Sequence, residues 1–196
     1  MTRYGDNEVP LFPLQTVLFP GGPLPLRLFE ARYTDMVGRC MHTDQPFGVV
    51  AIRVGHETGP SEIHTVGTLA RIVDFYQGSD GLLGITAIGE QRFRLLSERT
   101  ADDGLRIGTI ERLPNCEPLP LPDDASSMAE ILADVLDDLG KLYDGLERHF
   151  DDANWVGSRF CEILPLVLSQ KQECLEVEDP MIRLRIAAAV LQQWRK

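Results

Sequence analysis

The stretch LFPLQTVLFPGGPLPLRLFEARY, residues 11–33, decides how the first half of the chain folds. It is rich in bulky apolar side chains, yet prolines at positions 13, 20, 23 and 25 remove backbone N–H donors from it. A central strand would lose ladder hydrogen bonds at each proline, so we expect edge strands and bends here. The sequence Pro20-Gly21-Gly22-Pro23 predicts a forced turn.

The apolar side chains of this stretch have two interpretations. In one, they seal the interior of a small barrel. In the other, the proline-rich edge leaves some of them outside the core, as a patch that can hold an extended peptide. We expect Phe19, beside the turn, to lie at the surface. The peptide-binding candidates in the stretch are Leu18, Phe19, Phe29 and Tyr33.

Short apolar or alternating segments between glycine-bearing turns predict strands in the remainder of the first half. These segments are residues 47–54, 65–76, 82–88, 92–98 and 105–113. One helix is predicted over about 30–42, and Ser79-Asp80-Gly81 and Asp103-Gly104 have the composition of tight hairpin turns. Because hairpin connections dominate, we predict a small antiparallel barrel or sandwich over residues 1–114.

An aromatic pair, Phe75 and Tyr76, ends one of these predicted strands. Neighbouring residues of a strand point to opposite faces, so the two rings cannot share one face. We expect one ring to be accessible and favour Tyr76, whose hydroxyl tolerates water. Phe75 and Tyr76 complete the set of peptide-binding candidates.

A proline-rich segment separates two patterns of hydrophobic periodicity. Residues 113–124, LPNCEPLPLPDD, contain four prolines, which disfavour both sheet ladders and helices. We therefore predict a stiff connector over residues 115–123. Downstream, apolar residues recur at steps of three and four, which predicts a bundle of about four helices over residues 124–196.

Local signals place the individual helices of this bundle. An apolar stripe over residues 128–146 predicts the first helix, and the second is predicted over 155–164, ending before a proline. Ser169 and Gln172 have the spacing of a capping box at the start of the third. The dipeptide Asp-Pro at 179–180 combines an N-cap residue with a proline at the first position of the fourth.

Composition and charge limit the classes of function. With 196 residues, 43% of them hydrophobic, the chain is expected to fold as one large or two small globular domains. Its net charge is -11, and residues 115–196 hold 8 basic against 16 acidic residues. This balance disfavours binding to phosphate backbones. No apolar stretch is long enough to span a bilayer and no signal peptide is visible, so a cytoplasmic location is expected.

The sequence contains no clear constellation for catalysis or metal binding. The cysteines at 40, 116, 161 and 174 form no C-x-x-C pair, so we expect reduced thiols, and the histidines lack ligand spacing. The glycine run of residues 78–90 lacks the Gly-Lys-Ser/Thr ending of a phosphate-binding loop. Ser169 and Lys171, two apart on a predicted helix, point in different directions. We therefore assign no catalytic, cofactor-binding or metal-binding residue, and expect no enzyme.

Five segments carry ordered motifs: LFPLQTVLFPGGPLPLRLFEARYTDM (11–36), FGVVAIRVGHETG (47–59), VGTLARI (66–72), GEQRFRLL (89–96) and LPLVLSQKQECLEVEDPMIRLRIAAAVL (164–191). Together they resemble the N-terminal substrate-binding domain of the ATP-dependent protease Lon, a domain shared with cereblon and many short bacterial proteins. The last segment resembles the helical portion of that domain. The resemblance extends over about residues 9–195.

The resemblance implies an α+β architecture: a PUA-like antiparallel β pseudo-barrel with one helix, followed by a helical bundle. It also implies binding of exposed or unfolded polypeptide segments, or of a partner protein, in proteolysis or quality control. Lon continues into an ATPase module and a serine–lysine peptidase, whereas this sequence shows neither, so we expect a stand-alone member without protease activity. Cys174 stands where the family more often has an aliphatic residue, which we interpret as a packing variant.

Two other functions are alternatives to polypeptide recognition. A PUA-like fold is compatible with nucleic-acid binding, although fold is a weak guide to function and the charge balance opposes it. A small hydrolase of unrecognised type would need a concave site with converging titratable groups.

Overall fold

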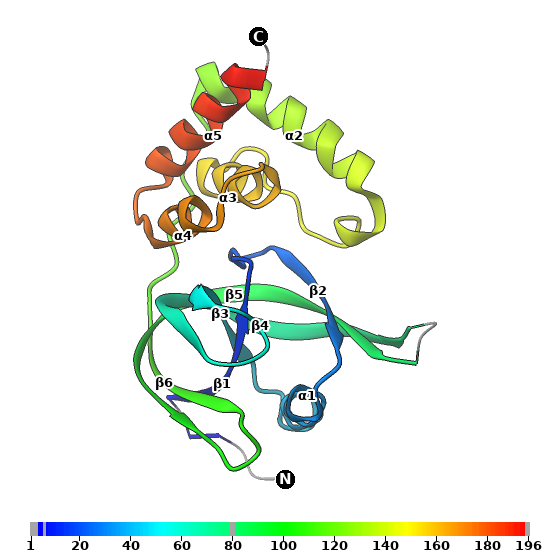
Figure 1. Ribbon diagram of the computed structural model, residues 1–196. Coiled ribbons are helices and arrows are strands. Elements are labelled where there is room, and N and C mark those ends of the chain that lie inside the picture. The colour runs from blue at the N-terminus through cyan, green and yellow to red at the C-terminus, as the bar shows by residue number, and fades with distance from the viewer. Residues whose placement is uncertain (1–3, 6, 79–80, 195–196) are drawn as a thin grey trace. The chain divides into compact units, whose positions relative to one another are not determined.

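A computed structural model describes residues 4–5, 7–78 and 81–194 (Figure 1). Within these ranges the chain forms six strands, five α-helices and two short 3-10 helices, which confirms the predicted α+β class. The chain divides into two compact units between Pro114 and Asn115. The first unit holds the strands and one helix, and the second holds the other helices.

The strands of the first unit form one sheet that closes on itself. They are β1 (Glu8–Leu14), β2 (Pro23–Leu28), β3 (Phe47–Gly55), β4 (Ser61–Gln77), β5 (Leu83–Thr100) and β6 (Arg106–Arg112). The strand order is β2-β5-β4-β3-β1-β6, and β6 also pairs with β5. Because β6 joins both β1 and β5, the strands β5, β4, β3, β1 and β6 form a closed ring.

The prediction of a purely antiparallel sheet is wrong at one pair, because β1 runs parallel to β3. The chain between these two strands includes β2 and the helix α1 (Ala31–Thr43), which is long enough for the crossover that a parallel pair needs. The segments predicted as two strands at 82–88 and 92–98 form the single long strand β5. Of the predicted turns, Gly104 has a φ of 80°, whereas Ser79 and Asp80 lie outside the described residues.

The interior of the ring is filled around the buried ring of Phe93. Gly48 and Gly67 face this ring from neighbouring strands, since a Cβ on Gly67 would lie 2.7 Å from the Cζ of Phe93 and one on Gly48 would lie 2.9 Å from it. A side chain at either position would therefore have to displace an aromatic ring in a closely packed interior. The glycines set the width of the barrel at this level.

Helix α1 covers one end of the barrel (Figure 1). Its side chains Tyr33, Met36, Val37 and Cys40 are buried. The guanidinium of Arg32 donates to the carbonyl of Gly104 at 2.8 Å, and Arg39 pairs with Asp103 at 3.4 Å. These contacts tie α1 to the β5–β6 turn.

The segment between β1 and β2 lies against the sheet, and this corrects the prediction for Phe19. Phe19 is fully buried, and Leu18 is buried as well. The hydroxyl of Thr68 donates to the carbonyl of Leu18 at 2.6 Å, and the amide of Gly21 donates to the carbonyl of Gly89 at 2.7 Å. Because Gly89 has no side chain, the backbone of the Pro-Gly-Gly turn approaches β5 closely and carries both side chains inward.

The second unit is a bundle of four α-helices, as predicted. They are α2 (Ser126–Leu139), α3 (Ala153–Ile163), α4 (Leu168–Glu176) and α5 (Pro180–Trp194), with short 3-10 turns η1 (Asp123–Ala125) and η2 (Gly140–Leu142). Helix α3 contacts α2, α4 and α5. It ends before Pro165, and Asp179 caps α5 by accepting from the amide of Met181 at 2.9 Å.

Two details of the predicted helices are wrong. Helix α2 ends at Leu139 because Gly140 has a φ of 61°, so the apolar stripe does not continue to residue 146 on one helix, and Leu139 is exposed. At the start of α4, the side chain of Gln170 accepts from the amide of Val167 at 3.1 Å. The predicted capping partner Gln172 is instead buried and donates to Glu176 at 2.8 Å.

The proline-rich segment belongs to the helical unit. Leu121 donates its amide to the carbonyl of Asp151 at 2.7 Å, and Ala153 donates to the carbonyl of Leu119 at 2.7 Å. Pro120 and Asp152 thus form an isolated antiparallel bridge, which the density of prolines had led us not to expect. The segment is fixed by hydrogen bonds at positions where it carries leucine rather than proline.

Candidate functional site

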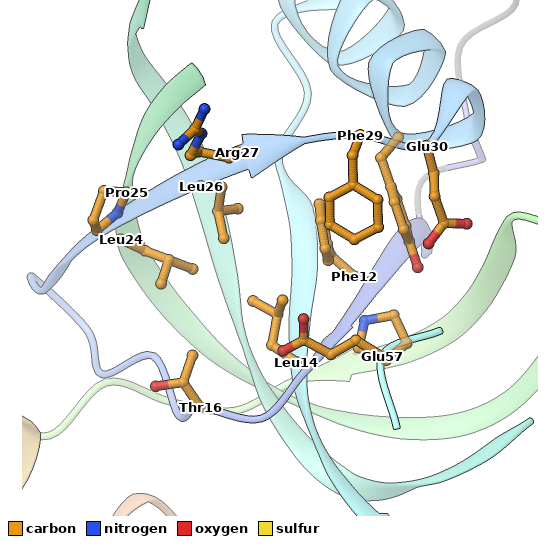
Figure 2. Close-up of a pocket in the computed structure, with 12 residues that line it drawn as sticks. Phe12, Leu14, Thr16, Leu24, Pro25, Leu26, Arg27, Phe29, Glu30 and Glu57 are labelled. Atoms are coloured by element: carbon orange, nitrogen blue, oxygen red, sulfur yellow. The ribbon is translucent and has the colours of Figure 1, made fainter. Parts of the chain in front are cut away.

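The barrel has a seam where two strand edges do not pair. Among the described residues, β2 pairs only with β5, and the pairings of β1 from Phe12 to Leu14 are with β3 alone. Figure 2 shows these parts of β1 and β2 on opposite sides of a cavity. We call this space the seam cavity.

The outer edge of β2 has few backbone N–H donors, because prolines occupy it. The carbonyl of Gly22 accepts from the amide of Gly89 at 2.9 Å, so this carbonyl points toward β5. Along an antiparallel strand, the backbone N–H and C=O groups of alternate residues point to opposite edges. The backbone groups of Pro23, Pro25 and Arg27 therefore point away from β5. Of these three residues only Arg27 has an N–H. The proline-rich stretch therefore forms an edge that resists further strand pairing.

The seam cavity has a volume of about 220 Å3 and is lined mainly by apolar side chains. Its walls come from β1, β2, the start of α1 and the loop after β3: Phe12, Pro13, Leu14, Thr16, Leu24, Pro25, Leu26, Arg27, Phe29, Glu30, Tyr33 and Glu57. Drug-sized ligands and cofactors usually occupy pockets of about 300–1,000 Å3. A cavity of this size is suited to one bulky side chain.

Aromatic rings form one wall of this cavity. The ring of Tyr33 stacks on that of Phe12, with centroids 4.0 Å apart and planes 10° apart. Tyr33 is buried, and this burial raises the pKa of its phenol. Phe29 lies beside them but is 60% exposed, and its ring is directed over the cavity in Figure 2. The wall therefore has a fixed base and an accessible ring above it.

Two acidic residues, Glu30 and Glu57, line the cavity. Glu30 precedes α1, and its Oε2 pairs with the Nη2 of Arg32 at 2.7 Å. Glu57 is held by the amide of Gln15, which donates to its Oε1 at 2.8 Å. Arg27 is exposed, and Figure 2 shows its guanidinium directed away from both glutamates.

The six predicted peptide-binding residues fall into three groups. Leu18 and Phe19 are buried and do not line the cavity, so they cannot contact a ligand there. Tyr33 is buried but lines the cavity, and Phe29 lines it and is exposed. The structure thus brings together two of the six candidates.

The remaining pair, Phe75 and Tyr76, lies near the end of the β4–β5 hairpin. Both side chains are exposed, so Tyr76 is accessible as expected, and Phe75 is accessible as well. Neighbouring positions of a strand direct the two side chains to opposite faces. Tyr76 packs its ring over Gly84 on the facing strand, which leaves Phe75 as the more exposed of the two.

Sequence reasoning missed Leu24, Glu30 and Glu57 as lining residues. The alternation of leucine with proline over residues 23–26 could have indicated that Leu24 faces inward beside Leu26. Glu57 comes from a loop distant in sequence, and no local pattern links it to β2.

A cluster of charged and polar side chains lies largely buried inside the helical unit. Arg159 is fully buried and pairs with Glu162 at 3.0 Å. Glu162 also accepts from the hydroxyl of Tyr143 at 2.8 Å, and its own carbonyl accepts from Lys171 at 2.6 Å. Burial raises the pKa of the Glu162 carboxyl, and Arg159 opposes that shift. These contacts hold the Glu162 carboxylate between the guanidinium of Arg159 and the hydroxyl of Tyr143.

Within residues 4–5, 7–78 and 81–194, no three side chains of histidine, cysteine, aspartate or glutamate come together as a metal site. In the same part of the chain, no helix has both the length and the apolar character needed to span a membrane.

The protein-family model for the ATP-dependent protease La (LON) substrate-binding domain matches residues 8–193 of this chain. The chain belongs to this family. The resemblance identified from the sequence motifs is therefore confirmed. The Lon substrate-binding domain family accounts for both units, since the match extends through the barrel and the helices.

Solved structures support the same assignment. The Lon N-terminal domain protein from Xanthomonas campestris is 35% identical, with a TM-score of 0.76, covering 93% of this chain and 97% of that chain. The N-terminal domain of the Mycobacterium avium complex Lon protease shares the fold at 17% identity, with a TM-score of 0.66 and the same coverage.

Curated relatives in the Lon substrate-binding domain family are longer proteins. Cereblon from Xenopus tropicalis is 34% identical over 120 residues, which are 59% of this chain and 26% of cereblon. Lon protease 2 from Myxococcus xanthus is 24% identical over 196 residues, which are 96% of this chain and 24% of the protease. The chain spans about a quarter of the length of these relatives.

Proposed function

We propose that this chain is a non-catalytic recognition module that binds exposed or unfolded polypeptide segments by taking a bulky apolar side chain into the seam cavity. The observation that carries the proposal is an accessible apolar cavity between two unpaired strand edges, in a member of a substrate-binding domain family. Phe29 and Leu24 supply the accessible apolar surface, and Phe12 and Tyr33 supply the base.

The geometry favours side-chain capture over strand addition. Strand addition depends on main-chain hydrogen bonds along an open edge. The outward positions of β2 are Pro23, Pro25 and Arg27, and the two prolines have no amide to donate. Affinity would come from apolar burial, at about 25 cal/mol per Å2, and would be moderate because the cavity accepts a single side chain.

A binding assay tests this proposal directly. Fluorescence anisotropy would be measured with short labelled glycine–serine peptides that carry one phenylalanine, one leucine or neither. We expect the phenylalanine and leucine peptides to bind and the plain peptide not to bind. The Phe29→Ala variant should bind the apolar peptides at least about fivefold more weakly, because it removes a wall of the cavity.

Phe75→Ala is the matched control, since it removes an equally exposed phenylalanine from the β4–β5 hairpin. It should leave the affinity unchanged. If Phe75→Ala weakens binding and Phe29→Ala does not, the hairpin rather than the seam cavity is the site. If none of the peptides binds the unaltered protein, the proposed function is wrong.

A further inference from the structure

We propose that Cys161 and Cys174 are a redox-active dithiol, which hydrogen peroxide converts to a disulfide that joins helix α3 to helix α4. The pair belongs to the helical unit, whereas every residue that lines the seam cavity belongs to the barrel unit. The inference is therefore independent of the proposed function and goes beyond it.

The two thiols are brought together by the packing of α4 on α3. Cys161 lies in α3 and Cys174 in α4, and these two helices contact each other. The side chains of Cys161 and Cys174 are hydrogen-bonded to each other, and they are 0% and 1% exposed. A disulfide requires two sulfur atoms about 2.05 Å apart. Two thiols that already touch can reach this distance by a small adjustment of α4, a helix of nine residues.

Cys174 is the nucleophile of the pair. The hydrogen bond from Cys161 lowers the pKa of the Cys174 thiol, and the positive charge of Arg183 acts in the same direction against the effect of burial. The same hydrogen bond, together with burial, raises the pKa of Cys161. Because the thiolate is the form that attacks an oxidant, Cys174 reacts first and Cys161 second.

Arg183 is held in place beside the dithiol. Its side chain is buried, and its Nη1 donates to the Oδ1 of Asn154 at 3.0 Å and to the Oγ of Ser158 at 3.2 Å. Its Nη2 donates to the carbonyl of Val177 at 2.9 Å. The Sγ of Cys161 lies 4.0 Å from the backbone carbonyl oxygen of Arg183. These contacts make the positive charge near the two sulfurs a fixed feature of the helical unit.

The oxidation takes place in two balanced steps. The Cys174 thiolate attacks one oxygen of hydrogen peroxide, so that an S–O bond forms and the O–O bond breaks. The departing hydroxide takes up the proton that the thiol released, which gives water and a sulfenic acid. The sulfur of Cys161 then attacks the sulfur of Cys174, so that the S–S bond forms and the S–O bond breaks. The proton of Cys161 leaves with the second hydroxide as water, and the two sulfurs have supplied the two electrons that reduce the peroxide.

The burial of both sulfurs fits a small, uncharged oxidant. Hydrogen peroxide can reach them when α4 opens locally, without unfolding of the whole unit. We therefore expect the reaction to be slow in the folded protein and to end at the disulfide, because the second thiol is already in contact with the first.

Peptide mapping of the full chain tests the inference. The folded protein would be treated with hydrogen peroxide, quenched with catalase and acid, alkylated with N-ethylmaleimide in denaturant and cut with trypsin. Trypsin cuts at Lys171, between the two cysteines, so the bridge would join peptide 160–171 to peptide 172–183. We expect this linked pair as the main oxidised product, and dithiothreitol should separate it.

A stability measurement gives a second readout that needs no variant. A disulfide that closes the segment 161–174 restricts the unfolded chain, so it should stabilise the helical unit. Trp155 lies in α3, and its fluorescence would follow the unfolding of this unit in urea. The oxidised protein should have a higher urea midpoint than the reduced protein, and dithiothreitol should reverse the shift.

Alanine variants locate the reaction. Cys161→Ala and Cys174→Ala should each abolish the linked peptide pair and the shift in the urea midpoint. Cys40→Ala is the matched control, since it removes a buried thiol from the barrel unit and should leave both effects unchanged. Circular dichroism would verify that each variant is folded.

Several results would overturn the inference. It is wrong if both peptides still carry N-ethylmaleimide after peroxide treatment, or if Cys174 is oxidised to sulfinic acid without a bridge. It is also wrong if the bridge forms only in urea, if Cys174 is linked to Cys116 instead, or if the bridged protein has no higher midpoint than the reduced protein. Failure of peptide binding at the seam cavity would leave this inference unaffected.

Discussion

Phe29 and Phe12 line the same wall of the seam cavity, but we expect Phe29 to contribute mainly to binding and Phe12 mainly to stability. Replacing each by alanine tests this expectation. Phe29 is 60% exposed and therefore 40% buried. Burying a whole phenylalanine side chain contributes about 1.5–3 kcal/mol, so Phe29→Ala should lower the free energy of unfolding by only about 0.6–1.2 kcal/mol. The affinity for apolar peptides, in contrast, should fall, because Phe29 forms an accessible wall of the cavity.

Phe12→Ala should give the reverse result. Phe12 is 6% exposed, lies in the main core cluster and stacks on Tyr33. Removing a buried phenylalanine costs about 3–5 kcal/mol, a large part of the roughly 5–15 kcal/mol that stabilises a domain. Any loss of binding in this variant would then follow from loss of structure.

Urea denaturation followed by far-UV circular dichroism would measure both changes. Tryptophan fluorescence is unsuitable for the barrel because Trp155 and Trp194 both belong to the helical unit. At equal slope, the midpoint should shift slightly for Phe29→Ala and strongly for Phe12→Ala. Equal shifts for the two variants would refute the assignment of Phe29 to an accessible wall.

Three further predictions concern the interior. Gly67→Ala should destabilise the barrel by about 1–3 kcal/mol in the same urea assay, because its new methyl group meets the ring of Phe93, and a wild-type midpoint would contradict this packing. Arg159→Met should lower the free energy of unfolding by about 3–5 kcal/mol, because it leaves Glu162 buried without its cation. The double variant with Arg159→Met and Glu162→Leu should regain much of this stability. If it does not, the loss of the ion pair is not the cause. Under native conditions at neutral pH, Cys116 should react with a thiol reagent first, since the other thiols are buried and burial raises the pKa of one of them to about 12; rapid reaction of all thiols would show that the cores open easily. The slow thiols in that experiment are Cys40, Cys161 and Cys174.

Features with a local cause were predictable from the sequence. The end of α3 before Pro165 and the start of α5 at Pro180 follow from what proline does to its neighbours, and both are confirmed. The change from strand to helix periodicity likewise identified the two architectures. Helix α2 shows the limit, because its apolar stripe continues past Gly140 while the backbone does not.

Features set by long-range pairing were not predictable. Phe19 is buried because Thr68 and Gly89, far along the chain, hold the backbone around it. The parallel pairing of β1 with β3 also leaves no trace in local periodicity, since a strand has the same alternation in either direction.

The candidate site lies between these cases. Phe29 was a candidate from the sequence because it belongs to the proline-rich apolar stretch of residues 11–33, but the same reasoning also selected the buried Leu18 and Phe19. The place of Glu30 in the lining, and its ion pair with Arg32, are revealed only by the folded chain.

The proline edge of β2 has a consequence for any unfolded chain that this module would meet. Such chains expose amides and carbonyls along their length and tend to add to open sheets, which is how aggregates propagate. An edge with prolines at two of its three outward positions, Pro23 and Pro25, is a poor template for that growth. The barrel can therefore contact aggregation-prone polypeptides without acting as a template for their assembly.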